Sequence, residues 1–140
     1  MTLAMRGIVA VLSSIMFLRG VDYLSNDRLL IGTNQSELVT MPHLWGAAFL
    51  VAAGFGVFAA LKNTLLSAVN FGVVGAAITA MFAIQVFQMD MLPYPWPPED
   101  IRVLGDSVGL STLFLIVALS SSHRMGVDKR KRELIGELDG

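Results

Sequence analysis

The side chains best suited to chemistry in this sequence are a few charged, imidazole and amide groups at the edges of long apolar runs. An ionisable group at membrane depth costs several kcal/mol unless it is paired or hydrated, so such a group is a functional candidate. Arg19 and Asp22 stand three residues apart and share a helix face. The pattern predicts a polar cluster, centred on an Arg19–Asp106 pair, that lines a vestibule open to the outer side of a membrane. The predicted members are Arg19, Asp22, His43, Gln85, Gln88 and Asp106.

A simpler interpretation of the same residues is interfacial. Arg19 and Asp22 stand near the end of the first apolar run, where long polar side chains reach the headgroups without any further role. The two interpretations differ on whether Arg19 pairs with Asp106. The sequence leaves both open.

The residue types that most catalytic and cofactor sites need are scarce. The chain has no cysteine, which excludes disulfides, thiolate metal sites, Fe–S clusters and thiol redox catalysis. Its two histidines, His43 and His123, are expected on opposite faces of the membrane, so they share no metal and hold no dihaem centre. There is no nucleophile elbow and no phosphate-binding glycine loop. We therefore expect a protein that is not an enzyme and that holds no cofactor or metal.

The composition is that of a chain surrounded by lipid. Of its 140 residues 54% are hydrophobic and 15% are charged, and the mean hydropathy is +0.65. Soluble domains average about 25% charged residues. The net charge of −1 gives no indication of a nucleic-acid partner. The bilayer is the expected environment.

Four runs are long and apolar enough to cross a bilayer, which takes about 20 mostly apolar residues. They predict helices at about 5–24, 44–61, 65–87 and 103–121. The first run also resembles a signal peptide, but no small-x-small cleavage site follows it, which favours a retained helix. The predicted fold is an all-α, integral membrane four-helix bundle, with a transmembrane domain at 1–124 and a basic cytoplasmic tail at 125–140.

The distribution of lysine and arginine predicts the orientation. Basic residues concentrate on the cytoplasmic side of membrane proteins. With four spans, one side receives Arg6, Lys62, Arg124, Lys129, Arg130, Lys131 and Arg132, and the other receives Arg19, Arg28 and Arg102. Both termini are therefore expected in the cytoplasm, in a cell membrane and most naturally the bacterial inner membrane. The run Lys129–Arg132 is predicted to anchor anionic lipid headgroups, or else only to fix the topology.

Small residues recur at every fourth position in three of the runs. Such stripes let helix backbones approach closely in lipid, where packing and hydrogen bonds drive association. We expect the stripes of the second and third helices to face each other, and the alternative is that Gly and Ala are merely common in membrane helices. The predicted packing residues are Ala48, Ala52, Gly56, Ala60, Ala68, Gly72, Ala76, Ala80, Gly105 and Gly109.

Two short motifs flank the first connection. Leu18-Arg19-Gly20-Val21-Asp22-Tyr23-Leu24 ends the first apolar run, and Leu44-Trp45-Gly46 opens the second. With the four-span layout they resemble small membrane proteins of actinobacterial phages, some of which lie near lysis genes. One departure is that no basic residue lies between Met1 and Met5, so the charged leader that times the best-known holins is absent.

This resemblance implies a holin-like protein that self-associates and permeabilises the membrane. The alternative is a non-enzymatic scaffold or partner-binding protein. Its outer connections, Ser25 to His43 and Gln88 to Arg102, would then dock another envelope protein. Expected partners are the lipid bilayer and either further copies of the chain or another membrane protein.

Overall fold

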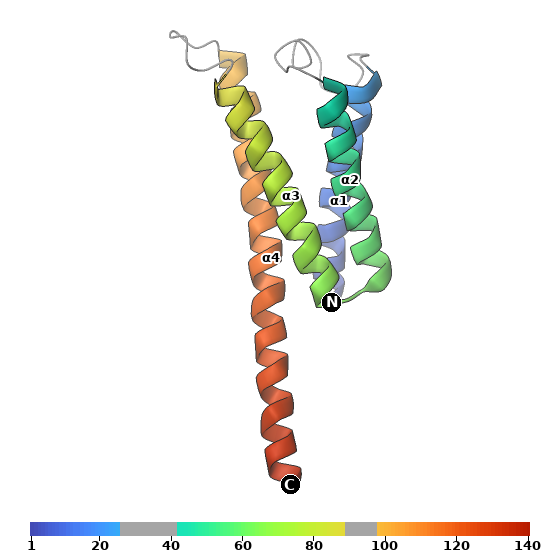
Figure 1. Ribbon diagram of the computed structural model, residues 1–140, viewed down its shortest axis with the longest axis vertical. Coiled ribbons are helices and arrows are strands. Elements are labelled where there is room, and N and C mark those ends of the chain that lie inside the picture. The colour runs from blue at the N-terminus through green and yellow to red at the C-terminus, as the bar shows by residue number, and fades with distance from the viewer. Residues whose placement is uncertain (26–41, 89–97) are drawn as a thin grey trace.

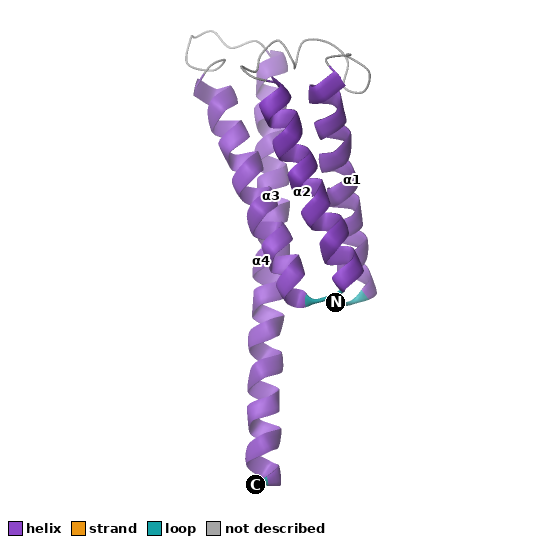
Figure 2. Cartoon of the chain, turned by 45° about the vertical axis from the view of Figure 1, so that its right-hand side comes forward, coloured by secondary structure: helices purple, strands orange, loops and turns teal. Residues whose placement is uncertain are grey.

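The structure is a computed structural model that describes residues 1–25, 42–88 and 98–140, without the side chains of 42 and 98–102. These ranges contain four helices: α1 (Leu3–Ser25), α2 (Pro42–Lys62), α3 (Leu65–Val86) and α4 (Pro98–Asp139) (Figure 1). All regular structure in them is helical (Figure 2). Each helix contains a stretch long and apolar enough to span a membrane. The predicted all-α membrane fold is confirmed.

The connection between α2 and α3 is a tight turn at Asn63 and Thr64. Asn63 takes a left-handed conformation with φ 53°, and its N–H donates to the carbonyl of Ala59, which ends α2. Thr64 then caps α3, because its hydroxyl accepts a hydrogen bond from the backbone N–H of Ser67 at 3.2 Å. The two helices are thereby held antiparallel.

The bundle is built from two closely packed helix pairs, α1 with α2 and α3 with α4. Contacts between α2 and α3 are less extensive, and α1 touches α4 at few positions. In Figure 1 the pairs approach each other at the α2–α3 turn and separate toward the opposite end. We call that opposite end, where α1 ends and α4 begins, the far end.

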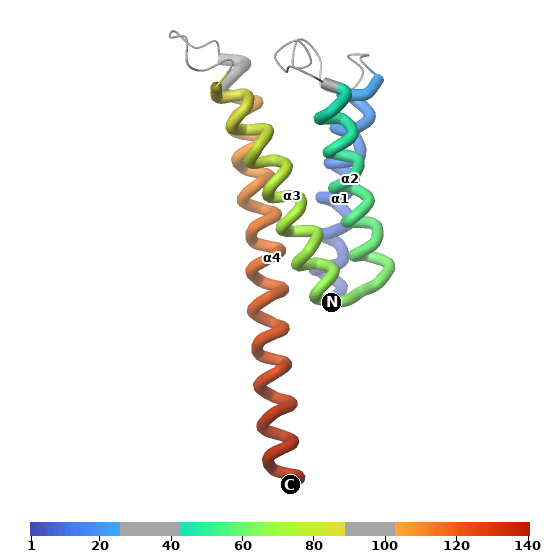
Figure 3. The backbone as a smooth tube through the Cα atoms, viewed as in Figure 1, coloured from blue at the N-terminus to red at the C-terminus, as the bar shows by residue number. Residues whose placement is uncertain are grey.

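The helix α4 differs most from its predicted bounds. The apolar run predicts 103–121, but the helix begins at Pro98. It then continues to Asp139 without interruption (Figure 3). No proline follows Pro98, so nothing in the sequence removes a backbone donor from this helix. At about 1.5 Å per residue, residues 122–139 extend about 27 Å, and all of them are exposed. The predicted boundary at 124/125 therefore falls within one helix.

Candidate functional site

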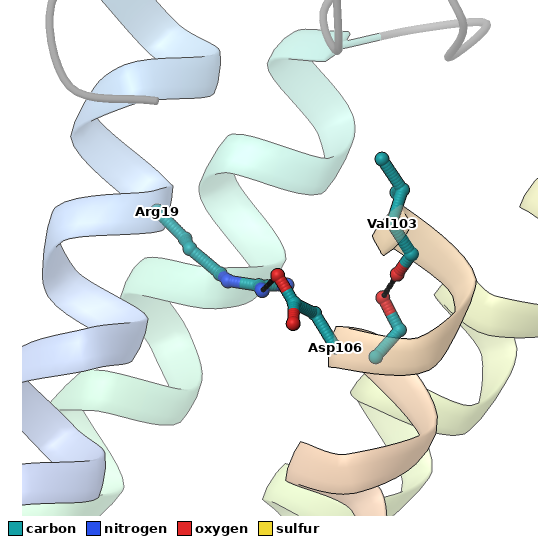
Figure 4. Close-up of polar contacts among 4 residues, drawn as sticks. Arg19, Val103 and Asp106 are labelled. Carbon is teal, nitrogen blue, oxygen red and sulfur yellow. Dashed lines mark hydrogen bonds and ion pairs between the residues drawn. The ribbon is translucent and has the colours of Figure 1, made fainter. Parts of the chain in front are cut away.

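The candidate site lies toward the far end, between α1 and α4. Arg19 is in the last two turns of α1, and Asp106 is in the first turns of α4. The Nη2 atom of Arg19 lies 3.9 Å from Oδ2 of Asp106, and Figure 4 shows the arginine extending across to the carboxylate. The structure thus brings together the two residues at the centre of the predicted polar cluster.

The two partners of this ion pair sit in different surroundings. The Arg19 side chain is 14% exposed, whereas that of Asp106 is 66% exposed. A separation of 3.9 Å is beyond hydrogen-bond range, so the pair is held by charge attraction. Low dielectric strengthens that attraction, while desolvation of Arg19 opposes it. Since α1 and α4 touch at few positions, this ion pair is a main link between them.

The neighbour of Asp106 fixes the local turn of α4. Ser107 is fully buried, and its hydroxyl donates to the carbonyl of Val103 at 2.8 Å (Figure 4). Because Ser107 turns inward and Val103 is also buried, the first turns of α4 are anchored on the bundle. Asp106 is left on the exposed side of the helix, directed toward α1.

The other four predicted members lie toward the same end but in different positions. Asp22 and Gln85 are half-buried, near the ends of α1 and α3. His43 and Gln88 are exposed, at the start of α2 and just beyond α3. The last two residues therefore belong to the rim of the bundle. Whether the six act together stays a prediction.

Sequence reasoning missed an aromatic cluster beside this site. Tyr23, Trp45, Phe49 and Phe82 come from α1, α2 and α3, and their ring centroids are 5.2 to 6.2 Å apart in five contacts. Trp45 is half-buried and meets Phe82 edge-on. The spacing of four residues from Arg19 to Tyr23, and from Trp45 to Phe49, was the available signal. These rings fill the space between α1, α2 and α3. The Arg19–Asp106 ion pair lies between α1 and α4.

The predicted pairing of small-residue stripes is wrong for α3. A Cβ on Gly72 would lie 2.7 Å from the carbonyl oxygen of Phe114 and 2.7 Å from the amide nitrogen of Ala118, both on α4. On α2, a Cβ on Gly56 would meet Ser13 of α1 at 2.6 Å and Phe71 of α3 at 2.8 Å. One turn further on, a Cβ on Gly75 would collide with the Phe114 ring, so the face of α3 that carries Gly72 and Gly75 is packed against α4.

The remaining stripe residues divide between buried and exposed positions. Ala52, Ala68 and Ala76 are buried, and Ala48, Ala60 and Ala80 are half-buried. Gly105 and Gly109 are exposed, and a Cβ on either would meet nothing within 4 Å. This glycine pair on α4 has no packing role within the described part of the chain.

The backbones of α1 and α2 also approach closely at two glycines that the four-residue spacing did not select. A Cβ on Gly20 would lie 3.0 Å from the carbonyl oxygen of Gly46, and a Cβ on Gly46 would lie 3.0 Å from the carbonyl oxygen of Gly20. Neither glycine has a small residue four positions away along its helix, so the stripe pattern could not reveal them. They stand in the two motifs around the first connection.

A side-chain hydrogen bond joins the two helices within each pair. Ser13 donates to the carbonyl of Ala53 at 2.8 Å, which links α1 to α2. Ser111 donates to the carbonyl of Ala76 at 3.2 Å, which links α4 to α3. Serine hydroxyls stabilise helix contacts in lipid, by about 0.6 kcal/mol on average. Each pair is therefore held by both close backbone approach and a polar contact.

The predicted tail anchor lies on the projecting part of α4. Lys129, Arg130, Lys131 and Arg132 are all exposed, and Lys129 lies 3.9 Å from Glu133 one turn further on. Within residues 1–25, 42–88 and 98–140, no three His, Asp or Glu residues are grouped so as to hold a metal ion.

The geometry above is that of a multi-pass membrane protein with an ion pair between its first and last helices. The helix pairs α1–α2 and α3–α4 are joined by the α2–α3 turn, the aromatic cluster and the Arg19–Asp106 ion pair. Comparison with known proteins finds no match to a family model, to a curated protein or to a solved structure.

Proposed function

We propose that this small membrane protein self-associates and permeabilises the membrane, in the manner of a holin. The observation that carries the proposal is the Asp106 carboxylate, 66% exposed on the surface of one copy although it lies within the apolar stretch of α4. A carboxylate that faces lipid is costly, whereas one that faces water or protein is not. Association that encloses Asp106 together with water therefore lowers the free energy.

The surface beside Asp106 supports this contact. Gly105 and Gly109 are exposed and lie on one face of α4, with open space where a Cβ would be. Glycines at this spacing allow two helices to approach closely in lipid. Contact between copies along this face would bring Asp106 carboxylates to a shared interior.

A single copy offers no pore of its own. Fully buried aromatic side chains, among them Phe49, Phe71, Phe82 and Phe114, occupy the interior of the bundle. Permeabilisation by this protein accordingly requires several copies. The basic bias of the α2–α3 turn and the tail supports an orientation with both termini in the cytoplasm. The membrane in this proposal is the bacterial inner membrane.

The test is induced expression in a bacterium while a voltage-sensitive dye reports the membrane potential. The wild type is expected to collapse the potential abruptly after a delay. A variant with Gly105→Leu and Gly109→Leu should delay or abolish the collapse, because the added side chains keep helices apart. Gly54→Leu is the matched control, since Gly54 is also exposed with nothing within 4 Å but lies on α2. If the wild-type protein accumulates in the membrane and the membrane potential stays intact, the proposal is overturned.

A second candidate is a scaffold that binds a partner without lysis. The feature that favours it is the exposed part of α4, residues 122–139, which is about 27 Å long at about 1.5 Å per residue and offers a surface for another protein. The outer connections first considered for docking lie largely outside the described residues. Steady growth together with a co-purifying protein that is lost on removal of residues 126–140 would favour the scaffold.

A further inference from the structure

The helix α4 runs past the start of α3 as it leaves the bundle, and residues of both helices line two hollows there. A hollow of about 410 Å³ opens there, and the residues that line it are Met1, Thr2, Leu65, Arg124, Val127, Asp128 and Lys131. Arg124 is directed to its rim, because Nη1 donates to the hydroxyl of Thr2 at 3.3 Å. The hollow therefore has apolar sides at Leu65 and Val127, and the cationic side chains of Arg124 and Lys131 lie at its edge.

A second hollow, of about 330 Å³, lies on the neighbouring face of α4. Its lining residues are Leu65, Leu66, Met125, Asp128, Lys129 and Arg132. The two hollows share Leu65 and Asp128, so they flank the start of α3 on either side. Between them they present four cationic side chains against one carboxylate, that of Asp128.

We propose that these paired hollows bind the phosphate of an anionic phospholipid headgroup. The ligand chemistry is a phosphate anion, and the position indicates a lipid as its source. The apolar surface of α3 starts at Leu65 and Leu66, directly beside the basic groups, which is the arrangement at the boundary between acyl chains and headgroups. The inference is independent of pore formation and concerns the end of the bundle opposite Asp106.

The basic residues of α4 do not all face the paired hollows. Arg124, Asp128 and Lys131 lie on one helix face at spacings of four and three residues. Arg130 lies on another face and lines a small separate hollow with His123, Gly126 and Val127. A bound phosphate therefore distinguishes Lys131 from Arg130, whereas general attraction to a charged membrane surface does not.

The test uses the full chain, purified in an uncharged detergent and titrated with short-chain phosphatidylglycerol, phosphatidylcholine or inorganic phosphate. The measured quantity is the dissociation constant. Lys131→Gln is expected to weaken phosphatidylglycerol binding about fivefold, in line with the attraction of one basic residue to anionic lipid. Arg130→Gln, which makes the same change in charge, should alter it less than about twofold. Asp128→Asn should tighten binding, because it removes the carboxylate that faces both hollows.

Three results would overturn the proposal. Equal weakening by Lys131→Gln and Arg130→Gln would mean diffuse attraction to the whole tail. Binding of phosphatidylcholine as tight as that of phosphatidylglycerol would mean that the anionic charge is not recognised. Binding of inorganic phosphate as tight as that of the lipid would make a free anion, and not a headgroup, the ligand.

Discussion

At the scale of single residues, the Arg19–Asp106 ion pair links the first and last helices. Its partners come from the first and last helices, and one is well buried while the other is largely exposed. A buried arginine that loses its partner becomes an uncompensated charge, which is far more costly than loss of the same contact in water. The pair therefore couples the position of α4 to that of α1.

Reversal of the charge at position 106 tests this coupling. Asp106→Arg is expected to destabilise the bundle by roughly 1–2 kcal/mol, less than the loss of a fully buried pair because Asp106 is exposed. Adding Arg19→Asp to that variant should recover at least half of the loss, since the charges are then exchanged. The measurement is unfolding in mixed detergent micelles followed by circular dichroism. Additive losses from the two substitutions would mean that the side chains act separately.

At the scale of helices, close backbone contact defines two pairs. Gly20 with Gly46 brings α1 to α2, and Gly72 with Gly75 brings α3 to the Phe114 region of α4. The aromatic cluster and the short turn then join the two pairs at opposite ends of the bundle. Because α1 and α4 meet at few positions, the seam between them is the part of the bundle most open to rearrangement.

A single methyl group should show which helices are in contact. Gly72→Ala is expected to cost about 1–3 kcal/mol, because the new Cβ meets backbone atoms of α4 that cannot move aside cheaply. Gly54→Ala is the control, and it should leave stability unchanged or raise it by about 0.4–1 kcal/mol, since its Cβ meets nothing within 4 Å. Free energies of unfolding in the same micelles give the comparison. A stable Gly72→Ala protein would contradict the α3–α4 contact.

At the scale of the whole molecule, the two described ends of the chain lie on one side of the bundle. Met1 lies beside the start of α3, and the tail of α4 extends further in the same direction (Figure 1). The basic residues of the α2–α3 turn and the tail are on this side as well. The positive-inside rule then predicts that this side is cytoplasmic.

Reporter fusions test the predicted orientation. A green fluorescent protein fused to either end should fluoresce, and alkaline phosphatase fused to either end should stay inactive, because both ends are expected in the cytoplasm. Insertion of the phosphatase in the connection between α1 and α2 should give activity. Reporters on opposite faces for the two ends would contradict four spans, and activity at both ends would reverse the orientation.

The sequence by itself determined the elements. Their number, and the approximate bounds of α1, α2 and α3, follow from apolar length, because lipid forces each backbone polar group to bond within its own helix. Asn63 and Thr64 likewise mark the α2–α3 turn through local backbone and capping chemistry. The Arg19–Asp106 pair was one of two interpretations that the sequence left open, and the structure shows the two charged groups 3.9 Å apart.

The tertiary structure decided which surfaces meet. A stripe of small residues shows that another backbone can come close, but it does not say which one, because the choice depends on the side chains opposite. The glycine face of α3 is packed against the Phe114 ring of α4, and single glycines at 20 and 46 allow close α1–α2 contact. Gly105 and Gly109, with the same spacing, were left exposed on the surface of the single chain. Partner choice is thus a property of complementary shapes from distant segments, which no local pattern contains.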